Sequence, residues 1–172
     1  MVATAIPRVP LGGATTLRKY YVDVKPHDGD DTTWLGGFGI QENKPLPSDP
    51  QTQDSSDMDS GGYQSTTVTA LAWSLELKLI RKTQAGTPTA YDPGQELIRT
   101  TALKMGVENL IDVRFYEMEP GGPRVEAFQG SAICQWSPEG GDMTALDTVT
   151  ATLSGAGILN AIAHPFPIIV TP

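Results

Sequence analysis

The sequence predicts a mainly β protein, an antiparallel β-sandwich or barrel with one packed α-helix. Its 172 residues suffice for one domain, and its 18 glycines and 14 prolines indicate a chain with many turns. Several segments alternate apolar and polar residues, as strands with one buried face do. Only one segment has both helical spacing and a capping signal, so a helical bundle is excluded.

The clearest alternation lies in residues 67–81. Its odd positions from 71 to 79 are all large and apolar, which predicts one core-facing side made of Leu71, Trp73, Leu75, Leu77 and Leu79. Fifteen residues at ~3.3 Å each extend roughly 50 Å, whereas ordinary strands end at about ten residues. This strand therefore either bends between two sheets or extends beyond its own domain.

Further strands are expected on both sides of this segment. Their predicted ranges are 17–24, 32–40 (weaker and glycine-softened), 109–119, 124–136, 146–153 and 158–164. The helix is expected over 93–105, because Asp92 can cap it, Pro93 suits its first position and Gly106 can end it. Residues 1–16 read as an irregular N-terminal arm, and 17–172 as a single domain with a long loop at 41–64.

Charge and composition exclude several classes of function. Of the net charge of −8, −7 lies between residues 23 and 59, which argues against nucleic-acid binding because each phosphate contact needs a cation. The single Cys134 excludes an internal disulfide framework and a multi-cysteine zinc site. The sequence has neither a signal-peptide pattern nor a run of ~20 apolar residues, which predicts a soluble protein made in a cytosol.

Residues 54–63, DSSDMDSGGY, contain residue types that also occur in protease and calcium sites. A protease nucleophile at Ser60 would need a glycine two positions earlier, where Met58 stands, and an oriented base, for which only His27 and His164 are present. The acids do not fit a calcium loop, whose terminal glutamate is missing, and leave at most an adventitious surface cation. We therefore expect no enzyme activity, no cofactor and no dedicated metal site, and favour a scaffold or binding module.

The order of segments resembles that of the major tail proteins of long, flexible-tailed bacteriophages, particularly those infecting actinobacteria. The matching pieces cover about residues 17 to 160. They are Arg18–Val24, the acidic stretch ending DMDSGGYQS, the strand around Trp73, Tyr91–Leu97, Asp112–Glu117, Glu126–Gly130 and Val149–Gly155. The resemblance rests on order and spacing, because this family has no short diagnostic signature.

This resemblance implies a structural virion protein. Such proteins form hexameric rings that stack into the tail tube, and strands of each subunit join into a closed barrel that lines the channel. The implied partners are further copies, the tape-measure, tail terminator and distal tail proteins, and double-stranded DNA that passes without specific binding. The implied location is the virion tail, assembled in the host cytoplasm without a membrane.

Within this hypothesis the 41–64 loop is the expected contact between rings, and the N-terminal arm the second candidate. The residues assigned to that contact are Asp49, Asp54, Asp57, Asp59, Gly61, Gly62 and Tyr63, with the two glycines as a hinge into the next strand. The alternatives are a tail terminator or tail-completion protein of related fold, or a β-sandwich module that binds sugar or protein. Exposed loop-tip aromatics such as Tyr63 and Tyr91 would favour the binding module.

Overall fold

A computed structural model describes residues 20–37, 39–59, 61, 63–118 and 122–167 of the chain. Its strands are β1 (Tyr20–Pro26), β2 (Leu35–Gly36), β3 (Ile40–Asp54), β4 (Thr66–Ile80), β5 (Thr83–Gln84), β6 (Thr87–Tyr91), β7 (Leu110–Glu117), β8 (Ala127–Pro138), β9 (Thr148–Gly155) and β10 (Asn160–Ala161). One α-helix, α1 (Pro93–Ala102), lies between β6 and β7, and short 3-10 turns span Asp31–Thr33 and Gly106–Asn109. The predicted fold class, mainly β with a single α-helix, is confirmed.

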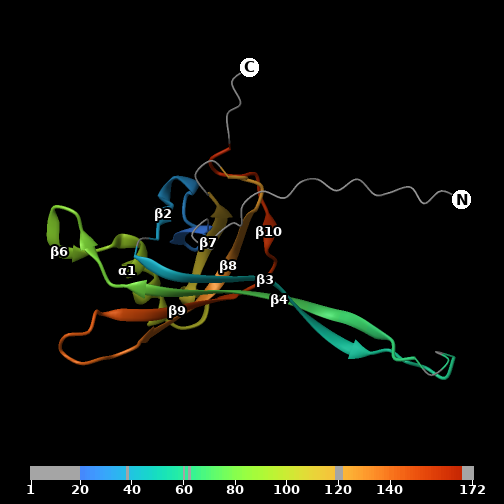
Figure 1. Ribbon diagram of the computed structural model, residues 1–172. Helices are drawn as coiled ribbons and strands as arrows, with labels where there is room; N and C mark the ends of the chain where they lie inside the picture. The colour runs from blue at the N-terminus through green and yellow to red at the C-terminus, as the bar shows by residue number, and fades with distance from the viewer. Residues whose placement is uncertain (1–19, 38, 60, 62, 119–121, 168–172) are drawn as a thin grey trace, which may run out of the picture.

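The strands form one antiparallel sheet in the order β2-β1-β7-β8-β9-β4-β3, with β10 also paired to β8 and a separate β5–β6 hairpin (Figure 1). β8 is the strand on which the sheet turns, because its first half pairs with β7 and its second half with β9. One apolar cluster contains residues of β1 and β7 together with residues of β4 and β9. The sheet therefore curls around its own core.

The helix closes this core through a buried glutamine. Gln95 is 1% exposed, its Nε2 donates to Ile80 O at 2.9 Å and its Oε1 accepts from Lys82 N at 3.3 Å. The predicted cap is present, since Gln95 N donates to Asp92 Oδ1 at 3.0 Å. The helix ends at Ala102 rather than at residue 105, because Lys104 N donates to Thr101 O in a tighter turn and Met105 is extended, at φ −124° and ψ 153°.

The other side of β1 and β7 carries cross-strand ion pairs instead of apolar residues. Arg114 Nη2 lies 2.8 Å from Asp23 Oδ2, and Lys25 Nζ lies 3.7 Å from Asp112 Oδ2. Both cations face the ring of Trp34, with Lys25 Nζ 5.1 Å and Arg114 Cζ 4.5 Å from its centroid. The strand predicted over 32–40 is reduced to β2 by the 3-10 turn that places this tryptophan.

The structure corrects the long loop predicted at 41–64. Residues 40–54 form β3, a fifteen-residue strand paired along its length with β4, and only residues 55–65 connect the two. β3 shows no alternation of apolar and polar residues, because most of its side chains are exposed on both faces of the strand. Its three prolines are tolerated because β3 is the last strand of the sheet.

The core-facing side of β4 is confirmed at four of its five predicted positions. Trp73, Leu75, Leu77 and Leu79 are at most 5% exposed, whereas Leu71 is 71% exposed. The apolar alternation of β4 continues past the point where other residues cover the strand, so the prediction of a buried Leu71 was wrong.

Two substitutions should distinguish the buried half of β4 from its exposed half. Leu75→Ala should lower the free energy of unfolding by about 2–5 kcal/mol, because it opens a cavity in a fully buried site. Leu71→Ala should change it by less than about 0.5 kcal/mol, because that side chain is largely exposed. Urea denaturation of dilute protein measures both, and equal losses would contradict the exposure assigned to Leu71.

Candidate assembly surface

The β3–β4 hairpin projects away from the body of the protein (Figure 1). Three register shifts interrupt its pairing, between Ile40 and Glu42, between Leu46 and Asp49, and between Gln51 and Thr52. The middle shift lies opposite Trp73, where burial on β4 ends. We call residues 47–72 the distal arm; all of its described residues are exposed.

Trp73 marks the border between body and arm. Its Nε1 donates to Gly157 O at 3.0 Å, and its indole packs against Gly155, where an added Cβ would lie 2.3 Å from Nε1. A Cβ added at Gly130 would lie 2.7 Å from the same ring. The glycines of β8 and β9 are therefore required by the bulk of this tryptophan, which predicts a strained body if either is substituted.

Beyond Trp73 the apolar side of β4 continues without a cover. Leu71 pairs with Pro50, and Val68, 54% exposed, pairs with Thr52 after the third shift. A β-branched residue and a leucine on an exposed strand add nothing to an isolated subunit, while their burial in a contact would contribute roughly 1.5–3 kcal/mol each. This side of the distal arm therefore presents two apolar side chains that nothing in the single subunit covers.

The distal arm is also purely acidic. It carries Asp49, Asp54, Asp57 and Asp59, and the sequence has no lysine or arginine between Lys44 and Lys78. Arms of two copies therefore repel one another when placed side by side. A partner surface must supply cations or hydrogen-bond donors.

Short hydroxyl contacts hold the tip of the arm in one shape. Ser55 N donates to Ser65 O at 2.9 Å, Ser65 N to Ser56 Oγ at 2.8 Å, and Ser56 N to Asp54 Oδ1 at 2.8 Å. The Ser56 hydroxyl and N–H hold the pKa of Asp54 below its ordinary value. Tyr63 extends from this tip, 83% exposed.

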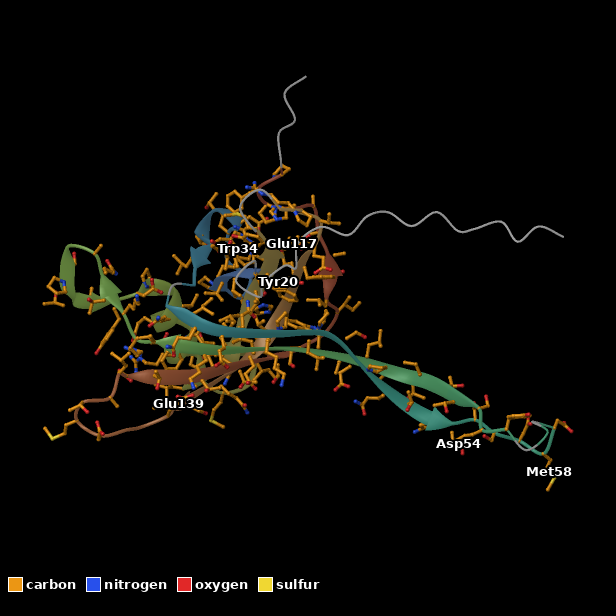
Figure 2. The ribbon with its side chains drawn as sticks, in the orientation of Figure 1. Tyr20, Trp34, Asp54, Met58, Glu117 and Glu139 are labelled. Atoms are coloured by element: carbon orange, nitrogen blue, oxygen red, sulfur yellow. The ribbon has the colours of Figure 1, made fainter. Side chains whose placement is uncertain are left out.

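The structure places the predicted contact residues along the arm rather than in one cluster. Asp54 ends β3 (Figure 2), and Asp49 borders the middle register shift. Asp57, Asp59, Gly61 and Tyr63 belong to the connection. Gly61 has φ +61°, a conformation that favours glycine, but four residues, 62–65, separate it from the first residue of β4. Gly62 and Ser60 lie outside the described residues. Their assignment to a contact between rings stays a prediction.

The groups most suited to chemistry are held in structural roles. His164 Nε2 lies 2.7 Å from Glu117 O, and its Nδ1 accepts from Phe166 N at 3.0 Å, so both ring nitrogens are occupied. His27 contacts Asp112 at 2.9 Å. Burial raises the pKa of the Cys134 thiol to about 12. Within the described ranges no three His, Cys, Asp or Glu side chains gather closely enough to hold a metal ion.

The two aromatic residues that would favour a binding module do not form one platform. Tyr63 is in the arm tip and Tyr91 ends β6, and Figure 1 shows these at opposite ends of the molecule. The Tyr91 ring lies 3.9 Å beneath the Arg81 guanidinium. A stacking site for sugar would need such rings side by side.

A second uncovered surface is the outer face of β3, β4, β9 and β8. Across these strands the pairing aligns Lys44 with Glu76 and Thr152, and Lys78 with Thr150. Glu139 accepts from the hydroxyls of Thr148 and Thr150, both at 3.0 Å, and pairs with Lys78 Nζ at 3.3 Å. This face therefore combines threonine hydroxyls with lysines that are aligned or paired with carboxylates.

The fold is shared with chains of known tail-like particles. A chain in the virion of a native gene transfer agent particle superimposes with a TM-score of 0.60 at 14% identity, covering 87% of this chain and 100% of that one. A chain of the anti-feeding prophage baseplate gives 0.57 at 10% identity, covering 95% and 100%. The sheath/tube terminator structure of an extracellular contractile injection system, PVC, contains one at 0.56 and 13%, covering 90% and 100%.

The fold is tail-tube-like. At these identities the likeness concerns the fold alone, and it extends across gene transfer agents and contractile systems, so a non-contractile tail stays a prediction. No protein-family model matches the sequence, and neither does any curated protein. None of the helices in the described part of the chain is long and apolar enough to cross a membrane.

Sequence reasoning located the acidic arm but missed its apolar side. Leu71 follows the same alternation as the core residues, whereas Val68 is out of phase with them and lies beyond the third register shift. Only the length of the strand signalled that it would extend past the body. The polar outer face was also missed, because it shares its strands with the core.

The tip geometry predicts a titration change. Ser56→Ala should raise the pKa of Asp54 toward its ordinary value, because the hydroxyl that stabilises the carboxylate is removed. Since the native pKa is lowered, the tip is stabilised above the ordinary value and loses this stabilisation as the pH falls through the lowered one. Carboxyl-detected NMR measures the shift. Ser55→Ala is the control, and an equal shift in both variants would contradict the contact.

Proposed function

We propose that this protein is a structural subunit of a tail tube, in which copies associate into rings through the distal arm and the rings stack. The observation that carries the proposal is the uncovered apolar side of β4 beyond Trp73, on an arm that leaves the body. The tail-tube-like fold supports it, because chains of this fold come from tail and tube assemblies.

A ring of six copies is the proposed unit. One of the similar chains comes from a gene transfer agent tail with C6 symmetry and another from a baseplate symmetrised six-fold. In such a ring each distal arm lies on a neighbouring subunit, which covers Leu71 and Val68. Ring closure also pairs or covers the edge strands β2 and β3, which otherwise present free backbone groups.

The hydroxyl-rich outer face of β3, β4, β9 and β8 is the proposed wall of the channel. Double-stranded DNA would bind tightly to a cationic wall, whereas here Lys44 and Lys78 are each aligned or paired with a carboxylate. This face lets DNA pass without specific binding. The tape-measure, tail terminator and distal tail proteins are the proposed further partners, in a virion tail assembled in the host cytoplasm.

A terminator or cap is the second candidate function. Two of the similar chains, both with a TM-score of 0.56, come from structures of a sheath/tube terminator and of a tube-terminating cap. A terminator would form single rings that bind the end of a tube, while a tube subunit stacks upon itself. Electron microscopy of the purified protein separates these outcomes.

The arm can be removed without opening the core. Replacing residues 50–71 by Asn-Gly joins Asp49 to its partner Ala72 through a two-residue hairpin. The shortened protein should keep the unfolding midpoint of the parent, since the deleted residues contribute nothing to the apolar cluster, yet it should form no rings or tubes. Negative-stain microscopy at rising concentration checks this, and normal tubes from the shortened protein would sink the assignment.

A point substitution tests the apolar contact itself. Leu71→Ser should raise the concentration needed for assembly at least tenfold, because the contact loses a buried leucine. Leu146→Ser is the matched control, since Leu146 is similarly exposed, at 66%, on the loop before β9. Equal effects from the two variants would show that the arm has no special part in assembly.

A further inference from the structure

A groove of about 950 Å³ runs along the first half of β3. Its walls include Tyr20, Tyr21, Ile40, Asn43 and Pro45. Among the described residues no strand pairs with this edge of β3, whose other edge pairs with β4. The groove therefore lies beside backbone N–H and C=O groups that have no strand partner in the described part of the sheet.

Asn43 is the polar group that this groove leaves incomplete. It is 7% exposed, and among the described residues neither its Oδ1 nor its Nδ2 has a hydrogen-bond partner. It pairs with Leu77, so its side chain is on the core-facing side of the strand. A buried carboxamide whose N–H and C=O groups lack hydrogen-bond partners lowers the free energy of unfolding, because both groups have lost water without a replacement. A ligand that supplies one acceptor and one donor removes this penalty.

A peptide bond has that pair of groups. Its C=O accepts from Nδ2 and its N–H donates to Oδ1, while an extended segment beside an edge strand also satisfies the strand's own backbone groups. The aromatic rings of Tyr20 and Tyr21 and the apolar Ile40 and Pro45 provide contact surface for side chains on either side of that peptide bond. The site thus fits an extended polypeptide rather than a small polar ligand.

The charge and the length of residues 1–19 favour this segment as the occupant of the groove. Residues 1–19 contain three basic residues, Arg8, Arg18 and Lys19, and no acidic one, in a chain of net charge −8. Acidic bodies repel each other, and a basic extension counters this repulsion where it meets a neighbour. Nineteen extended residues span roughly 60 Å, which is enough to reach another subunit.

We propose that the β3 groove receives residues 1–19 of a second copy of this chain, with the Asn43 carboxamide binding a peptide bond of that segment. The inference rests on the proposed function, which places copies side by side. It assigns a contact different from the distal arm, with the donor and the receiver at separate positions on each subunit. Such head-to-tail contacts propagate around a ring.

The test uses dispersed subunits, so that it does not depend on tube formation. A labelled peptide of residues 1–19 is titrated by fluorescence anisotropy into protein lacking residues 1–19. We expect binding that weakens with salt and that is at least tenfold weaker in the same protein carrying Asn43→Leu. Gln135→Leu, an exposed amide outside the groove, is the matched control and should leave binding unchanged.

Stability separates recognition from a structural role. Asn43→Leu should leave the unfolding midpoint of the dilute subunit unchanged or raise it, because it removes an unsatisfied buried amide, while it weakens peptide binding at least tenfold. A variant that loses both stability and binding would overturn the role given to Asn43.

The identity of the donor chain is tested with the full-length protein at monomeric dilution. Affinity for the peptide equal to that of the shortened protein supports a groove open to a second copy. Tenfold weaker binding would mean that the groove is filled by its own chain, and tighter binding of a peptide of residues 45–63 would mean that the distal arm is the occupant. Either result overturns the proposal, whereas absence of tubes with intact peptide binding would count against the proposed function alone.

Discussion

The structure depends on the row of apolar side chains along β4, which extends further than the part of the protein that buries it. Leu79, Leu77, Leu75 and Trp73 hold the curled sheet on its core, and the same row continues past the body as exposed Leu71. Trp73 stands at the border, where Gly155 leaves room for its ring. One strand therefore both stabilises the body and presents apolar side chains beyond it.

The long partner strand follows from this arrangement. Without β3, the outer half of β4 would have unpaired backbone groups on both edges, so the hairpin has to be long on both strands. Because both faces of its outer half meet solvent in the single subunit, the sequence of β3 can be polar and rich in proline. Its acids keep free arms apart and leave cationic or backbone partners as the acceptable contacts.

Two surfaces of this subunit are incomplete in different ways. The distal arm lacks a cover for apolar side chains, whereas the β3 groove lacks a partner for a buried carboxamide. A hydrophobic contact is tolerant of exact position, while a carboxamide facing a peptide bond requires one register. In the proposed assembly, the first surface would attract neighbouring copies and the second would align them.

The sequence by itself determined the mainly β class, the helix cap at Asp92 and the buried side of β4, because these depend on the local spacing of side chains. It also located the acidic segment. Only the tertiary structure decided that residues 40–54 are a strand, since their pairing with β4 is made across the chain and not by their own alternation. The exposure of Leu71 and the unpaired Asn43 were likewise invisible, because burial depends on how far the body extends around a strand.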